Sequence, residues 1–362
     1  MSSTSEALIR TKGILVTPAS VFVPSETFIS TATTKIIENV FDLGLSFIVS
    51  IIGIVSNTLV IAVFCKQGFK DSVSISMTTI AVWDLIKSLG GAMQRIVGPM
   101  ELISPPKAQS WRIISQVVFS YSLSFSTYVT SALAAYVAVE RCLCVCFPLH
   151  VKWLLTRKIS AFMCIAISLV VFGGFSVMFG IYDIVYVWNP RYNASVAIYK
   201  YNTFALANKG PLFQYYNLIG VICPCLSFAV ITFCTGVITQ RLRQASSFRN
   251  KNELDGGAEK QQLSSRDRQV VKMLLVIIAI YIISLFPRII IYFVKIFVYE
   301  FYFLRKYHNF IQVSSYLCFF FDLVNGSINL FVFLEMSSSF RATFLQMTSA
   351  CQPKARSHKT CK

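Results

Sequence analysis

Residues 113–142 read IISQVVFSYSLSFSTYVTSALAAYVAVERC, and this stretch decides the fold. It carries no charge from Ile113 to Val139 and then ends in the charged pair Glu140-Arg141. A run of that length suffices to cross the hydrocarbon core of a bilayer, which takes about 20 residues as a helix. Many of its side chains are Ser, Thr or Tyr, so we expect this helix to face other helices more than lipid.

The charged pair at the end of this stretch has two interpretations. An arginine at the edge of a bilayer is costly and usually has a pairing or switching role. Alternatively, Arg141 extends its side chain to the lipid headgroups. Pro148 follows the pair, and basic residues follow Pro148. This order places the end of the helix at a membrane surface.

The composition is that of a membrane protein. The chain has 362 residues, of which 55% are hydrophobic and 14% are charged, whereas a soluble domain carries about 25% charge. The net charge of +17 does not require nucleic acid, because membrane proteins concentrate Lys and Arg in cytoplasmic loops. We expect membrane lipids as partners and no nucleic acid.

Seven apolar stretches predict an all-α membrane protein, a seven-transmembrane helix bundle: residues 41–64, 75–98, 113–139, 159–181, 214–238, 270–294 and 311–334. Residues 1–40 form an extracellular tail without a cleavable signal peptide. The membrane domain spans 41–334 and includes a mobile cytoplasmic loop at 240–269. Residues 335–362 form a short amphipathic eighth helix and a cytoplasmic tail.

The basic residues predict the orientation. Lys and Arg are more numerous in the loops that follow odd-numbered spans, which favours an extracellular N-terminus and a cytoplasmic C-terminus at the plasma membrane. Asn193-Ala194-Ser195 is a glycosylation sequon and falls outside in this arrangement. Asn325-Gly326-Ser327 also matches the sequon but lies within a span, so we expect it to stay unmodified.

Polar residues and prolines recur within the spans. The set comprises Asn57, Asp84, Glu140-Arg141, Pro224, Pro287, Asn325 and Asn329. In this order it resembles the rhodopsin-like (class A) G-protein-coupled receptors over about residues 40–350. The runs ERCLCVCFPLH at 140–150 and EMSSSFR at 335–341 look like those of divergent invertebrate, especially molluscan, chemosensory-type or orphan peptide-type receptors.

The resemblance implies a ligand-activated receptor that signals through a heterotrimeric G protein, most simply of the chemosensory type. A neuropeptide receptor of the same fold is the alternative, and a transporter or channel is the alternative from another class. An enzyme is disfavoured, because no motif supplies a nucleophile with its base or a metal cluster. The resemblance also implies roles for Asp84, Arg141 and Asp267.

Asp84 is an ionisable residue in the middle of a span and therefore needs partners. The family pattern places it beside Thr130, Asn325 and Asn329, and such a cluster of oxygens would hold an allosteric sodium ion. The alternative is a protonated, hydrogen-bonded Asp84. Apart from that sodium ion, we expect no cofactor and no metal.

At the inner end of the third span, Arg141 is expected to pair with Glu140 and with Asp267 at the start of the sixth span. This lock would hold the resting state closed against the G protein. The alternative is that Asp267 pairs with basic neighbours in its own loop. Pro224 and Pro287 bend their helices and are candidate hinges, or they are tolerated kinks.

The chain also departs from the family pattern. Gln116 stands where most members have the cysteine of an outer disulfide, and the outer loop at about 182–213 has no cysteine. We therefore expect no disulfide and a looser outer loop. Cys142 replaces the tyrosine that usually follows the arginine, and Thr232 and Phe333 stand at two further tyrosine positions.

The ligand site is predicted among the outer halves of the spans. Leu123 stands where amine receptors of the family carry an aspartate, which argues against an amine ligand. Three cations against one anion in this region favour an anionic ligand, either a small acidic molecule or a peptide: Lys87, Arg95, Arg288 and Asp322. The alternative is structural, with Lys87 paired to Asp322 and Arg95 extended outward.

After the last span, residues 340–345 have apolar side chains at i and i+4, as an interfacial helix does. Cys351 follows and is a candidate for palmitoylation. An unmodified cytosolic thiol is the alternative.

Overall fold

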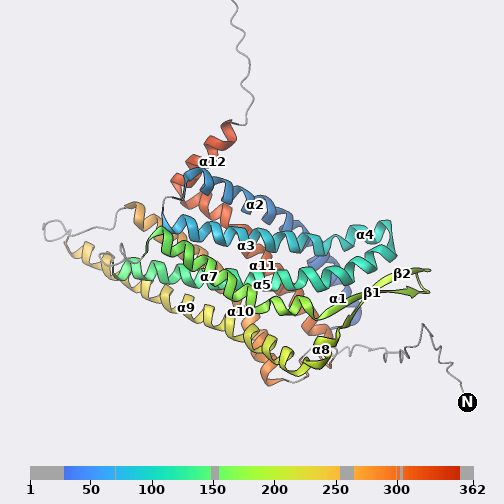
Figure 1. Cartoon of the computed structure of the whole chain (residues 1–362). Coiled ribbons are helices and arrows are strands. Elements are labelled where there is room, and N and C mark those ends of the chain that lie inside the picture. The colour runs from blue at the N-terminus through green and yellow to red at the C-terminus, as the bar shows by residue number, and fades with distance from the viewer. Residues whose placement is uncertain are drawn as a thin grey trace, which may run out of the picture.

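The computed structural model describes residues 28–69, 71–147, 155–252, 265–298, 300–301 and 305–350. Within them, seven long helices pack side by side as a bundle (Figure 1). They are α2 (Ser46–Gln67), α3 (Ser72–Arg95), α5 (Pro105–Cys146), α7 (Arg157–Phe175), α9 (Lys209–Asn252), α10 (Ser265–Phe297) and α11 (His308–Met336). Each contains most or all of one predicted span, so the predicted fold class is confirmed.

Six of these helices, counted with the short segments that continue α2 and α7, are long and apolar enough to cross a membrane. The exception is α3, which carries Asp84, Lys87 and Arg95, all with no exposed surface. An intramembrane ion must face the interior of a bundle, and α3 packs against both α2 and α5. The charges that lower its hydropathy therefore place α3 at the centre of the fold.

The first span starts earlier than predicted. Helix α1 (Thr31–Ile37) is capped by Ser30, whose hydroxyl accepts a hydrogen bond from the Thr33 amide, and it runs through the π-helix η1 (Glu38–Leu45) directly into α2. The helix therefore begins about ten residues before the predicted boundary at residue 40, while the boundary of the membrane domain stays a prediction. The π-helical turn holds Asp42 in a buried position.

The segment predicted as a loop at 240–269 is partly helical. Helix α9 continues to Asn252 and α10 begins at Ser265, while residues 253–264 lie outside the described part of the chain. Both candidate hinge prolines, Pro224 and Pro287, lie inside continuous helices. Their role as hinges stays a prediction.

The loop that was predicted to lie outside the membrane is a β-hairpin of strands β1 (Tyr182–Asn189) and β2 (Ala194–Tyr201), paired in antiparallel register from Tyr182 opposite Tyr201 to Asn189 opposite Ala194. It follows the short helix η2 (Ser176–Gly180) and precedes α8 (Thr203–Ala207). Asn193 in its turn is exposed and has a positive φ of 47°, which asparagine tolerates well. The exposure suits the glycosylation sequon, and the modification itself stays a prediction.

Contacts other than a disulfide attach the hairpin to the bundle. The amide of Ala197 donates to Ser110 Oγ on α5 at 3.1 Å, and Tyr182 stacks on Tyr121 with ring centroids 6.3 Å apart. Burial, reinforced by Tyr182, raises the pKa of Tyr201 to about 12, so this phenol stays neutral. The expectation of a loose outer loop is therefore wrong for the described hairpin. Helix α4 (Val97–Ile103), between α3 and α5, lies at the same end of the bundle (Figure 1).

At the opposite end lies α12 (Ser338–Ala350), the predicted amphipathic helix (Figure 1). Its Phe340 is 1% exposed and packs on Phe64 and Phe333, with ring centroids 5.4 and 5.2 Å apart. Gln67 at the end of α2 donates to Ser339 O and Thr343 Oγ1. Apolar packing and hydrogen bonds together hold α12 against α2 and α11 at this end of the bundle.

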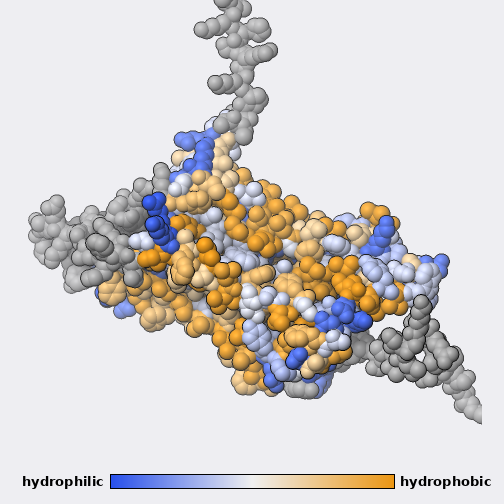
Figure 2. Space-filling model, in the orientation of Figure 1, coloured by the Kyte–Doolittle hydropathy of each residue, from blue (hydrophilic) through white to orange (hydrophobic). Residues whose placement is uncertain are grey.

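The surface agrees with a membrane-spanning bundle. Figure 2 shows hydrophobic side chains along the flank, while hydrophilic ones gather toward the two ends. Large apolar residues on α7 and α9, such as Leu169, Val170 and Phe233, are about 70% exposed. In water this would be costly, so these side chains are lipid-facing.

Candidate functional site

A cavity of about 680 Å³ opens among α5, α9, α10, α11 and the hairpin. Its volume lies in the range of small-molecule binding sites. Six tyrosines contribute rings and hydroxyls to the lining: Tyr121, Tyr128, Tyr182, Tyr199, Tyr216 and Tyr292. The hairpin covers part of the cavity through Tyr182 and Tyr199.

The cavity has a one-sided charge. Arg288, Lys295 and Arg305 line it, and no aspartate or glutamate is among the described residues of its wall. Lys295 lies over the Tyr292 ring, 5.6 Å from the centroid. A low-dielectric cleft lined by one sign of charge attracts the opposite sign.

Helical spacing explains why these side chains converge. Arg288, Tyr292 and Lys295 stand at i, i+4 and i+7 on α10, and such residues lie on one face of a helix. Tyr121 and Tyr128 are seven residues apart on α5 and share a face in the same way. Sequence reasoning missed four of these residues, although this spacing of cations and tyrosines was a readable signal.

Arg288 is the best-defined cation of the wall. It is 7% exposed, and its Nη2 pairs with Asp322 Oδ2 on α11. Its Nη1 donates to Tyr292 OH at 3.3 Å, and the guanidinium lies 5.9 Å from the Phe319 ring centroid. Its Nε is buried and has no hydrogen-bond partner. Tyr292 OH is itself hydrogen-bonded to Tyr128 OH on α5.

The structure corrects the predicted ligand site. Of the five predicted residues only Arg288 lines the cavity; Lys87, Arg95, Leu123 and Asp322 do not. Leu123 is fully buried in the packing of α5. The neighbouring Ser124 and Ser120 reach the cavity in its place.

The predicted excess of buried positive charge is also wrong, because each of the three cations has a carboxylate partner. Arg95 is fully buried instead of extending outward, and it pairs with Asp42 of η1 through its Nη2 and with the Asp42 carbonyl through Nε at 2.8 Å. Sequence reasoning overlooked Asp42, which lies at the start of the first predicted span. Two further cations that were not predicted, Lys295 and Arg305, line the cavity together with Arg288.

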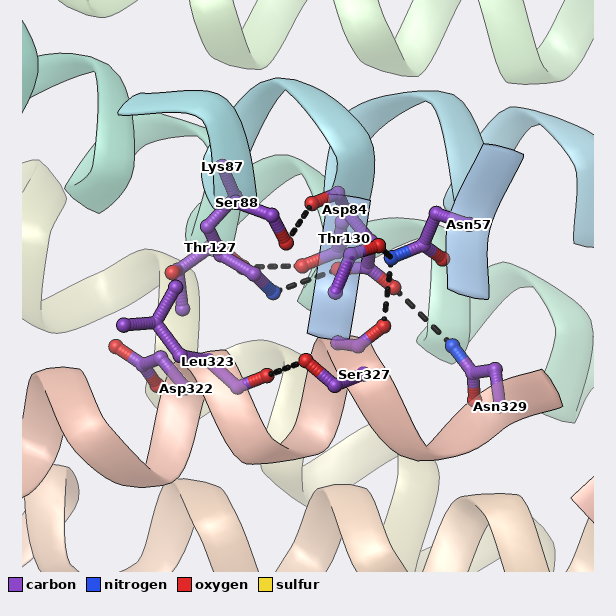
Figure 3. Close-up of polar contacts among 12 residues, drawn as sticks. Asn57, Asp84, Lys87, Ser88, Thr127, Thr130, Asp322, Leu323, Ser327 and Asn329 are labelled. Carbon is purple, nitrogen blue, oxygen red and sulfur yellow. Dashed lines mark hydrogen bonds and ion pairs between the residues drawn. The ribbon is translucent and has the colours of Figure 1, made fainter. Parts of the chain in front are cut away.

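The centre of the bundle holds a second ion pair (Figure 3). Lys87 Nζ donates to Asp84 Oδ1 at 2.6 Å, and Asn329 Nδ2 donates to Asp84 Oδ2 at 3.1 Å. Asp84 and Lys87 are both 0% exposed. The structure thus brings Asp84 and Asn329 together as predicted, and it adds Lys87 from the next turn of the same helix.

This arrangement does not fit a sodium ion. The ammonium of Lys87 already supplies the positive charge at the carboxylate. Thr130 Oγ1 donates to the Thr127 carbonyl, and Asn329 directs its amide nitrogen, a donor, at Asp84 (Figure 3). Asn325 is buried with its Oδ1 unpaired within the described part of the chain, but one available amide oxygen does not make up the set of oxygen ligands that such a cation needs.

Small residues allow the ion pair to be enclosed. A Cβ on Gly326 would lie 2.9 Å from Lys87 Nζ and 3.0 Å from Asp84 Oδ1. A Cβ on Gly53 would lie 2.4 Å from Ser88 Oγ. Glycine at these positions lets α2 and α11 approach α3 closely.

At the inner end of α5, Glu140 has a different environment from the predicted one. It is 1% exposed, and its carboxylate accepts hydrogen bonds from four hydroxyls on α3, α5 and α7: Ser72, Ser76 at 3.1 Å, Tyr136 at 2.9 Å and Ser160 at 2.7 Å. This cage links three helices where the family resemblance implied an arginine partner.

The expected Glu140–Arg141 pair is therefore wrong. Within the described part of the chain Arg141 forms no ion pair, and its Nε is buried with no hydrogen-bond partner. Asp267 lies in the first turn of α10, but its side chain is outside the described residues, as is Pro148. The Arg141–Asp267 lock stays a prediction.

The nine cysteines within the described ranges are all free thiols. Cys142, at the family's tyrosine position, lies beside Arg141 and packs against the hydrophobic core. Cys351, the palmitoylation candidate, falls outside the described residues.

Comparison with known proteins adds one match. The family model described as "Serpentine type 7TM GPCR chemoreceptor Srw" matches residues 44–351, which include all seven long helices; α1 and most of η1 precede the matched region. A search of curated proteins finds no match.

Proposed function

Since the chain belongs to the serpentine 7TM chemoreceptor family Srw of G-protein-coupled receptors, and is therefore a multi-pass membrane receptor and no enzyme, we propose that it detects small acidic molecules at the cell surface. Membership in this family implies a ligand and a G protein as partners. The cavity supports the proposed chemical class of the ligand, which family membership does not specify.

The lining of the cavity carries this proposal. Its wall presents Arg288, Lys295 and Arg305 with no carboxylate among the described lining residues. An acidic ligand gains charge-assisted hydrogen bonds there, whereas an amine would meet only like charge. The tyrosine rings add apolar area for an aromatic or aliphatic body, and their hydroxyls add hydrogen bonds.

The size of the cavity favours a small molecule over a long peptide. A volume of about 680 Å³ suits a compact ligand, and β1–β2 lies across part of the opening.

We further propose that the hairpin end faces the extracellular side of the plasma membrane. The exposed Asn193 sequon lies at this end, as does the cavity. The opposite end then carries Glu140, Arg141 and α12 and contacts the heterotrimeric G protein. Lipids cover the apolar flank, and palmitate on Cys351 would add a second anchor.

The test is a second-messenger assay in cells that express the receptor. The probes are phenylacetate, 4-hydroxyphenylacetate and indole-3-acetate, each compared with its neutral amide. We expect responses to carboxylates and none to the amides. Arg288→Gln, Lys295→Gln and Arg305→Gln should each raise the half-maximal concentration about tenfold or more, because a charge-assisted hydrogen bond is lost.

Arg112→Gln is the matched control. Arg112 is also basic and lies on α5, but it pairs with Glu38 and Glu101 and does not line the cavity. It should respond like the wild type. Equal responses to acids and amides, or no response to any acid at millimolar concentration, would contradict the proposal.

A further inference from the structure

Arg288 has only part of its hydrogen-bonding capacity satisfied within the described part of the chain. Its guanidinium makes one bond to the carboxylate of Asp322, through Nη2, and a long one to Tyr292 OH at 3.3 Å. Its Nε is buried without a partner, and the residue lines the cavity. A buried donor left without a partner is costly and calls for a specific explanation.

The geometry of a guanidinium makes the unpaired Nε informative. The Nε–H and one Nη–H bond point in parallel, and together they match the two oxygens of a carboxylate. Asp322 uses the Nη2 side alone. A carboxylate that entered from the cavity would engage Nε and Nη2 at once, and would form two charge-assisted bonds in place of one.

We infer that the carboxylate of the ligand displaces Asp322 from Arg288, so that binding exchanges the ion pair between α10 and α11 for an ion pair between α10 and the ligand. This inference rests on the proposed function and adds a means of activation to it. Arg288 has an anionic partner before and after the exchange, so this buried cation is never left uncompensated.

Asp322 has a second cation within reach. The ammonium of Lys87 reaches α11, since a Cβ on Gly326, one helical turn from Asp322, would lie 2.9 Å from Lys87 Nζ, and Lys87 and Asp322 are labelled on facing helices in Figure 3. A released Asp322 therefore turns toward Lys87, next to Asp84 and Asn329. The same event loosens α10 from α11 and strengthens the contact of α11 with α3.

Such an exchange has two discrete states, as a receptor switch requires. Without ligand, Arg288 binds Asp322 and joins α10 to α11. With ligand, Arg288 binds the carboxylate, and α10 is free to move relative to α11. Only a ligand with differential affinity for the two states shifts their populations, and a neutral amide cannot replace Asp322 as the anionic partner of Arg288.

The decisive variant is Asp322→Asn, which weakens the competitor for Arg288. In purified receptor, the affinity for phenylacetate should rise about tenfold or more, and that for phenylacetamide should stay within about twofold. Asp183→Asn is the matched control, since it removes one negative charge from an exposed hairpin residue that does not line the cavity. It should leave both affinities unchanged.

A measurement on the wild type covers the case in which Asp322→Asn fails to fold. Infrared difference spectra on adding phenylacetate should show a shifted carboxylate stretch, and the double variant Arg288→Gln/Asp322→Asn should lack it. The amide should produce no such band. Loss of the band in the folded double variant assigns it to the exchanged pair.

The failures of the two proposals are separable. If phenylacetate binds the wild type and loses affinity in Arg288→Gln, but Asp322→Asn gains nothing and the infrared band is absent, the exchange is wrong and the acidic-ligand proposal stands. If no acid in the panel binds the wild type, the proposed function fails and the exchange falls with it.

Discussion

Replacing Lys87 with methionine tests the ion pair at the centre of the bundle. Lys87 and Asp84 are both 0% exposed and lie 2.6 Å apart. Removing one partner of a buried pair leaves an uncompensated charge and costs about 3–5 kcal/mol. The remaining partner of Asp84 in Lys87→Met is the amide of Asn329 at 3.1 Å, which cannot replace a full positive charge.

Proton uptake sets an upper limit on this cost. Protonating an ordinary aspartate at pH 7 costs about 4 kcal/mol, and the cost falls by about 1.4 kcal/mol per pH unit. We therefore expect Lys87→Met to lose about 3–4 kcal/mol of unfolding free energy at pH 7 and about 1–2 kcal/mol at pH 5. Because protonation relieves the isolated carboxylate, the loss shrinks as the pH falls.

The assay is unfolding of the purified receptor in mixed micelles, followed by tryptophan fluorescence. The double variant Lys87→Met/Asp84→Asn closes a mutant cycle and should recover most of the loss, since it leaves no unpaired charge. A loss below about 1 kcal/mol in Lys87→Met at pH 7 would refute this reasoning. A double variant no more stable than Lys87→Met would refute it too.

Three further outcomes are expected. Replacing sodium by choline should leave the unfolding temperature of the wild type unchanged, while Lys87→Met should gain a dependence on sodium; a sodium-sensitive wild type would contradict the role given to Lys87. Gly326→Ala should cost about 1–3 kcal/mol of stability, because the new Cβ lies 2.9 Å from Lys87 Nζ, whereas Gly173→Ala, with nothing within 4 Å, should cost nothing measurable. Arg95→Met should destabilise the receptor by about 3–5 kcal/mol and Arg95→Met/Asp42→Asn by much less; equal losses in the two would show that the pair is not coupled.

The helices were predictable because a bilayer demands long apolar runs, and such runs are local in the sequence. Even α3, which carries three buried charges, was identified from its length. The boundaries were less predictable: α1 begins at Thr31 and α9 runs to Asn252, because helices can extend beyond the hydrocarbon core into polar surroundings.

The sequence predicted which residues belong to the polar core better than it predicted which of them bond to one another. Asp84 and Asn329 do meet, but Lys87, read as a ligand residue, is the cation that neutralises Asp84. Spacing shows that i and i+3 share a face. It does not show how each helix is rotated about its axis, and this rotation decides which of two carboxylates a cation reaches.

The same limit applies to Glu140 and to the cavity. The hydroxyl cage around Glu140 combines residues from three helices, and no local pattern announces it. The cavity depends on the hairpin and on the relative depth of α5 and α10. The proposal of an acidic ligand therefore rests mostly on other residues than those that first suggested it.

The most direct test of the account is an experimental structure of the receptor bound to an acidic agonist such as phenylacetate. The account predicts the ligand carboxylate within about 3 Å of Arg288 Nε and Nη2, with Asp322 released from Arg288 and turned toward Lys87. A ligand bound elsewhere, or a carboxylate in the cavity with the Arg288–Asp322 pair intact, would contradict it.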